Sequence, residues 1–312
     1  MRWVGYGRPV NRIDRAYRVV ESNLMRLRFR SPNFDHFSRA ALRFWEFQGS
    51  RLAAAIAYYG FFAIFALLLI GYSIFGILLT NNPELLDIVG DFLRQNLPFI
   101  DVRAILDSGQ NVGLIGLIGL TFTGVAWIEA IRSSQRLIWR VDQQPGYVGL
   151  RQLLDLLVLL GVLVLLALSQ LAVYGLARLI TWLAHGFFPS VVGLLLRVAV
   201  NLLLAAALLV VVPRLRMTLR RAAPSVLLVG VGITLLNTVG KSFVGLVQRN
   251  PAYGLVGSAV GVLVYLYVFN QLLLFGAAWA ATSAHGRAID LSSDDKSTPV
   301  GQNTWIRDSK PE

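Results

Sequence analysis

The chain has 312 residues, of which 55% are hydrophobic and only 15% are charged, and its formal net charge is +12. Soluble domains carry about a quarter charged residues, so this composition excludes an ordinary soluble protein and indicates an integral membrane protein. Cysteine is absent, which excludes disulfides and cysteine metal sites. The three histidines lie far apart without ligand spacing, so we expect no metal and no cofactor.

The first 51 residues are basic, with eleven arginines and no lysine. Apolar residues recur between these arginines at helical spacing, as at Ile13, Tyr17, Val20 and Leu24. This pattern predicts a basic amphipathic region on the cytoplasmic membrane surface. An ordinary topogenic terminus and a specific lipid-binding region both fit it.

Six apolar runs are each long enough to cross a bilayer, which takes about 20 helical residues. They cover about residues 53–79, 112–131, 152–177, 191–212, 225–247 and 255–281. The second run begins with Gly113, Gly116 and Gly119, which permits close contact with another helix. The predicted fold class is an all-α integral membrane protein with six transmembrane helices.

Two further segments are too polar to span. Residues 83–111 place charged and apolar side chains on opposite helix faces, which predicts a surface or re-entrant helical hairpin between the first two spans. Residues 284–312 are polar and poor in apolar side chains, which predicts a disordered cytoplasmic tail.

The distribution of basic residues orients the six spans. Of the 29 Lys and Arg residues, 23 fall in segments assigned to one side of the membrane and four in segments assigned to the other. Basic loops stay in the cytoplasm, so both termini are predicted to be cytoplasmic. The charge of +12 is therefore mainly topogenic, and it requires no nucleic-acid partner.

Two acids lie near the predicted cytoplasmic ends of their spans. Glu129 ends the second span and Asp155 begins the third, and both are close in sequence to Arg132, Arg136 and Arg151. We favour an interfacial ion-pair cluster that fixes the two helices. The alternative is a proton-coupling carboxylate, which requires greater depth in the membrane.

The fourth and fifth spans each hold a cation and an amide four residues apart, which places each pair on one helix face. Both cations lie about 9 Å inside the predicted outer end of their helix. The candidate substrate-binding residues are these two pairs and three amides of the third and sixth spans: Arg197, Asn201, Asn237, Lys241, Asn270, Gln271 and Gln170. Snorkelling of the two cations to the interface is the alternative, but it does not explain the amides.

Several stretches resemble a known family in order and spacing over about residues 35–285. They are AAAIAYYGFFAIFALLLIG in the first span, IRSSQRLIW after the second, Pro213 after the fourth and YGLVGSAVGVLVYLYVFNQLLLFGAAWAAT in the sixth. The resemblance is to the YihY/BrkB family of bacterial inner-membrane proteins, once mislabelled ribonuclease BN. It implies six spans and an inner-membrane location. It also implies a link to serum resistance and, in a related branch, to lipopolysaccharide export.

Two functions are compatible with these features. The first is an inner-membrane transporter or flippase-like protein for an anionic amphiphile or lipid, because Arg and Lys bind phosphate groups and apolar walls suit an amphiphile. The alternative is a non-transporting scaffold that docks envelope partners. No Walker motif is present, and acids lie mainly in loops, so we expect neither ATP hydrolysis nor enzyme activity. The expected partners are anionic membrane lipids, and homo-oligomerisation is left open.

Overall fold

The computed structural model describes residues 32–80, 102–143, 146–183, 188–247, 254–292 and 300. The side chains of several helix ends, including those of Gln170 and Lys241, are outside this description. Six helices of the described part are long and apolar enough to cross a membrane, over Gly49–Ile70, Leu114–Ile138, Val148–Leu168, Gly193–Val211, Leu219–Gly240 and Ala259–Thr282. The predicted six-span all-α fold is therefore confirmed.

Five spans lie within longer helices and the fourth continues into a π-helical segment, and a short sheet pairs the connection after the fourth span with the segment after the sixth. The helices are α2 (Pro32–Glu46), α3 (Gly49–Thr80), α5 (Val102–Ile138), α6 (Val148–Leu183), α7 (Phe188–Ala206), α8 (Leu219–Val247) and α9 (Gly254–Thr282). A π-helical segment, η1 (Ala207–Val211), continues α7 directly. Strands β1 (Leu215–Met217) and β2 (Ala288–Asp290) pair in antiparallel fashion.

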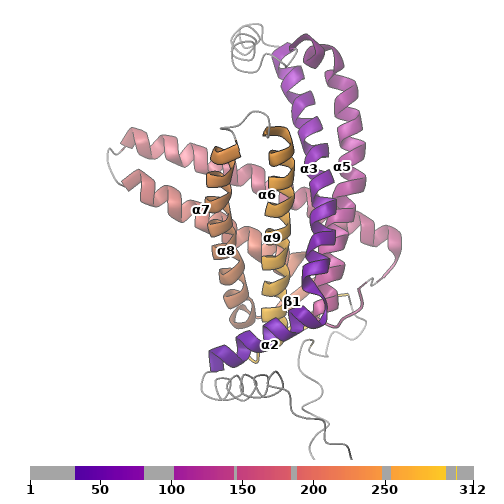
Figure 1. Ribbon diagram of the computed structural model, residues 1–312, viewed down its shortest axis with the longest axis vertical. Coiled ribbons are helices and arrows are strands. Elements are labelled where there is room, and N and C mark those ends of the chain that lie inside the picture. Colours follow the sequence, from indigo (N-terminus) through magenta and orange to yellow (C-terminus); the bar gives the residue numbers. More distant parts are fainter. Residues whose placement is uncertain are drawn as a thin grey trace, which may run out of the picture.

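The spanning helices form contacting pairs (Figure 1). α3 packs along α5, and α9 packs between α3 and α8. α6 and α7 form another pair, which contacts α5 through α6 and α8 through α7 and is tilted against α3 and α5 in Figure 1. The basic end of the molecule is defined here as the end formed by α2, the last turn of α5, β1 and β2. It corresponds to the side that the charge distribution predicts to be cytoplasmic.

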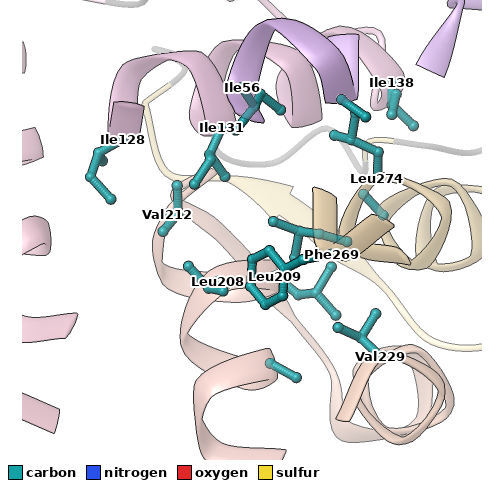
Figure 2. Packing of buried hydrophobic residues seen from close by; sticks show 14 of the residues in the cluster. Ile56, Ile128, Ile131, Ile138, Leu208, Leu209, Val212, Val229, Phe269 and Leu274 are labelled. Atoms are coloured by element: carbon teal, nitrogen blue, oxygen red, sulfur yellow. The ribbon is translucent and has the colours of Figure 1, made fainter. Parts of the chain in front are cut away.

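The buried apolar core lies toward the basic end. Figure 2 shows Ile131 of α5, Leu208 and Leu209 of η1, and Phe269 of α9 gathered in one cluster. Large apolar side chains farther along the helices are exposed, as for Phe122 at 75% and Leu195 at 63%. Lipid is as apolar as these side chains, so a membrane protein leaves them on its surface without cost.

Helix α2 lies across the C-terminal end of α9 (Figure 1). Ala40 and Phe44 face inward, and the ring of Phe44 contacts that of Phe275. His36 contacts the backbone oxygen of Trp279 through Nε2 at 3.0 Å. Trp45 is 69% exposed on the other side of the helix. Residues 32–46 thus form an amphipathic helix, while residues 1–31 lie outside the described residues, and the position on the membrane surface stays a prediction.

The two polar segments differ from their predictions in extent. α5 begins at Val102, so residues 102–111 of the predicted hairpin belong to the helix of the second span, and residues 83–101 lie outside the described residues. The prediction of a disordered tail is wrong for residues 288–290, which form β2 opposite β1. Ala288 is fully buried and Asp290 is held by a buried arginine, contacts that composition alone does not reveal.

The predicted close approach of the glycines at the start of the second span is confirmed for Gly116. A Cβ at this position would lie 3.0 Å from the backbone nitrogen of Ile70 and 3.0 Å from Cβ of Leu69, both in α3. A Cβ on Gly119, one turn along the same helix, would lie at an ordinary 3.6 Å from Cβ of Ala66.

We predict that Gly116→Ala destabilises the protein, because the new methyl group presses on backbone that cannot rotate away. Overpacking of this kind costs about 1–3 kcal/mol. The measurement is the thermal unfolding temperature in detergent, with Gly119→Ala as the matched control. Equal melting temperatures for the two variants would contradict the close α3–α5 contact.

Candidate functional site

A buried ion pair joins α5 to α6 at the basic end. The Arg132 side chain is fully buried, and that of Asp155 is 1% exposed. Nε of Arg132 donates to Oδ1 of Asp155 at 3.1 Å, and Nη2 donates to Oδ2 at 3.1 Å. A bidentate contact of this kind is the strongest arrangement for a guanidinium and a carboxylate. Nη1 of Arg132 donates to the backbone oxygen of Gln143 at 2.8 Å, which ties the α5–α6 connection to the pair.

Other charges extend this pair into a cluster. Nη2 of Arg214, which precedes β1, donates to Oδ1 of Asp155 at 2.8 Å. Glu129 lies 3.7 Å from Arg132 and 3.8 Å from Arg151. The predicted ion-pair cluster between the second and third spans is therefore confirmed, with Arg214 as a member that the sequence did not assign.

Arg136 instead connects α5 to the sheet. Its guanidinium holds Asp290 of β2 through two bonds, at 2.9 Å from Nη1 and 2.6 Å from Nη2. Nη1 also donates to the backbone oxygen of Pro213 at 3.0 Å. One fully buried arginine thus fixes both the start of the β1 connection and the end of β2.

A third buried arginine closes the last turn of α9. Nε and Nη2 of Arg221 donate to the backbone oxygens of Ala280 and Ala281 at 2.8 and 2.9 Å. The last carbonyls of a helix lack partners within the helix, so this side chain satisfies them. The guanidinium also lies 5.1 Å from the centre of the Trp139 ring, which binds α8, α9 and the end of α5 together.

The π-helical segment η1 ends the fourth span. Val212 donates its backbone N–H to the oxygen of Ala207, five residues earlier, at 3.2 Å. Nε2 of the fully buried Gln135 donates to the oxygen of Leu208 at 3.0 Å. π-helical turns are rare and occur frequently at functional sites. Ala207, Val210 and Val211 of this segment line the same groove as residues of α6.

An apolar groove of about 640 Å³ runs between α6, η1 and the sheet. Its walls come from α6, η1, β1 and the residue after β2. The lining residues are Leu154, Leu157, Val158, Gly161, Val162, Leu165, Ala207, Val210, Val211, Arg214, Leu215, Arg216, Met217 and Leu291. Arg214 and Arg216 are the two polar members, so the groove has hydrocarbon walls and a cationic end.

The position of Arg214 sets the polarity of this groove. Its bond to Asp155 places the guanidinium beside Leu154, whereas the groove continues three turns along α6 to Leu165. Burial lowers the pKa of Arg214 from its usual value, and the carboxylate of Asp155 acts in the opposite direction. An arginine nevertheless stays charged at neutral pH. The groove therefore has the amphipathic character of a lipid.

The predicted polar residues of the fourth and fifth spans lie in the seams between helices. Nδ2 of Asn201 in α7 donates to Oγ1 of Thr234 in α8 at 2.9 Å. Oδ1 of Asn237 in α8 accepts a bond from the hydroxyl of Tyr265 in α9 at 2.6 Å. The two amides thus link α7 to α8 and α8 to α9.

The structure does not bring the three other described site residues together with these amides. Arg197 is exposed on α7, next to the exposed Leu194 and Leu195. Asn270 is fully buried and donates to the oxygen of Leu266 in its own helix at 2.8 Å. Gln271 donates to Oγ of Ser50 at 3.4 Å. The side chains of Lys241 and Gln170 lie outside the described residues, and none of the other five predicted residues is among the described residues that line the groove.

Comparisons with known proteins show to which family the chain is similar. A model of the virulence factor BrkB family matches residues 40–300. The inner membrane protein YhjD of Escherichia coli (strain K12) is 27% identical over 300 residues, which cover 88% of each chain. An uncharacterized protein of Dickeya dadantii (strain 3937) is 28% identical over 81% of this chain and 84% of its own. No solved structure matches. The resemblance drawn from the sequence is confirmed, and these matches and the six spans support a multi-pass inner-membrane protein.

We predict that Asp155→Asn strongly destabilises the protein, because it leaves two guanidinium groups at the basic end without their shared counterion. Breaking a buried ion pair costs about 3–5 kcal/mol. The free energy of unfolding, measured by denaturant titration in detergent, tests this. Asp35→Asn is the control, because Asp35 and Arg39 form a pair of which each side chain is 31% exposed, and exposed pairs contribute less than about 1 kcal/mol. A similar loss of unfolding free energy in both variants would show that the ion-pair cluster does not stabilise the fold.

Proposed function

The chain belongs to the virulence factor BrkB family of membrane proteins, and within that frame we propose that it carries an anionic amphiphile of the cell envelope between the two leaflets of the inner membrane. The observation that carries this proposal is the groove beside α6, with its apolar walls and arginine end. Its volume of about 640 Å³ lies in the range of small-molecule sites, about 300–1,000 Å³.

The two arginines associated with the fourth span support movement between leaflets. Arg197 is exposed in the middle of α7, near the start of the fourth span, and Arg214 follows η1 at the basic end. The chain is helical from Arg197 to Val211, and a rise of about 1.5 Å per residue makes this part roughly 20 Å long. The hydrocarbon core of a bilayer is about 30 Å thick. An anionic head group therefore meets one cation in the fourth span and a second in the turn that follows it.

The alternative is a non-transporting scaffold, which predicts a packed interior and a docking patch on residues 83–111. Most of that segment lies outside the described residues. The groove favours the carrier, because a scaffold has no need of a cationic cleft that faces lipid.

We predict that Gly161→Trp slows lipid movement. A Cβ on Gly161 meets no atom within 4 Å, so a large side chain can enter the groove without displacing the helices. The assay uses vesicles that contain the purified protein and fluorescent phosphatidylglycerol, in which a membrane-impermeant reductant reports exposure of the label at the outer face. The wild-type protein should accelerate this exposure, and the variant should reduce the protein-dependent rate by about tenfold, which corresponds to roughly 1.4 kcal/mol of barrier.

Gly175→Trp is the matched control. Gly175 lies on the same helix, outside the groove, and its Cβ position is also free of neighbours within 4 Å. This variant should transport at the wild-type rate. No protein-dependent movement in the wild type would favour the scaffold, whereas equal slowing by both tryptophans would show that the groove is not the route.

A further inference from the structure

Only one of the three nitrogen atoms of the Arg214 guanidinium donates a hydrogen bond to the described residues. Its two hydrogen bonds both come from Nη2, to Oδ1 of Asp155 at 2.8 Å and to the backbone oxygen of Arg151 at 3.2 Å. Nε and Nη1 donate to no described residue. The side chain is 15% exposed and lines the groove. Two donor groups of the guanidinium, on different sides of it, are thus without a partner among the described residues.

The charge of Arg214 is also incompletely balanced. Asp155 serves Arg132 and Arg214 together, and Arg132 holds both carboxylate oxygens. Arg216, which is exposed on β1, adds a further cation to the groove lining. An anion at this place therefore meets excess positive charge near the apolar walls, where electrostatic attraction is less screened than in water.

The backbone holds Arg214 in a conformation that side chains rarely adopt. Its φ is 57°, in the left-handed region that most residues other than glycine avoid. The N–H of Arg214 donates to the oxygen of Val211 at 3.1 Å, and its own oxygen accepts the N–H of Leu291 at 3.1 Å. Such strain persists only where surrounding structure fixes it, and it clusters at functional sites.

We propose that Arg214 is the head-group receptor of the groove and binds the phosphate of an anionic phospholipid through an N–H of Nη1 or Nε, while the acyl chain lies along α6 toward Leu165. A charge-assisted hydrogen bond from the guanidinium to a phosphate oxygen explains a preference for phosphate-bearing lipid over a neutral amphiphile. Asp155 is a positioning residue, since it holds Nη2 together with the backbone oxygen of Arg151, and Arg132 in turn holds Asp155. This inference names the ligand class of the site on which the proposed carrier function rests.

The test is binding rather than transport. Full-length protein in detergent is titrated with fluorescent phosphatidylglycerol, and unlabelled phosphatidylglycerol and phosphatidylcholine compete for the site. The wild type should prefer phosphatidylglycerol, and Arg214→Asn should weaken binding of this lipid by at least about tenfold, with little change for phosphatidylcholine. Asparagine tolerates the left-handed backbone, and Asp155 keeps Arg132, so the variant should fold. Arg214→Lys should retain part of the preference.

Arg220→Asn is the control, because Arg220 is exposed at the start of α8 and does not line the groove. It should bind both lipids as the wild type does. Soluble glycerol phosphate should not displace the labelled lipid at equal concentration, because it lacks the chain, and displacement would show a free-phosphate site instead. An unchanged lipid preference in folded Arg214→Asn, or no preference in the wild type, overturns the assignment. If Gly161→Trp still blocks transport in that case, the carrier function stands without it.

Discussion

Asp155 is a carboxylate with a 1% exposed side chain that two guanidinium groups share, and the basic end of the molecule is built on this arrangement. Each of these charges would be costly to bury alone, because the interior cannot solvate it. Together with Arg132 and Arg214 it connects α5, α6 and the turn before β1. Arg136 and Asp290 then attach the same turn to β2. The connections of four helices are thus fixed by charge rather than by apolar packing alone.

This fixed end determines the shape of the groove. The turn that Arg136 holds at Pro213 follows the π-helical segment, and Gln135 takes up a carbonyl of that segment at Leu208. The helix therefore ends with a widened turn whose geometry is stabilised from α5. Beyond it, the strained Arg214 points its side chain to the groove beside α6. A cation placed by strain and ion pairs beside apolar walls is the arrangement on which the proposed binding of an anionic amphiphile rests.

The spans and the ion-pair cluster followed from the sequence, whereas the groove did not. Long apolar runs predict spanning helices because a bilayer admits few other structures, and every predicted span overlaps a helix. Glu129 and Asp155 next to several arginines predicted the cluster correctly. Arg214, however, is one of four arginines in the hinge at residues 213–224, and nothing in the sequence distinguishes it from Arg216, Arg220 or Arg221. Its role depends on a π turn and on strand β2, which begins 74 residues later in the chain, and both are tertiary effects.

The polar residues of the fourth and fifth spans show a related limit of prediction from the sequence. Spacing of four predicts that two polar side chains share one helix face, but it does not say which neighbour each side chain meets. Asn201 and Asn237 find partners in Thr234 and Tyr265 of adjacent helices. Whether a polar side chain serves packing or a ligand is decided by the partner helix, which a single sequence does not specify.

The most direct test of the central claim is an experimental structure of the protein in a bilayer that contains phosphatidylglycerol. The account predicts lipid density along α6 from Leu154 to Leu165, with a phosphate within hydrogen-bond distance of Nε or Nη1 of Arg214. A groove filled by the protein's own chain or by another copy, with Arg214 turned away from lipid, would contradict it.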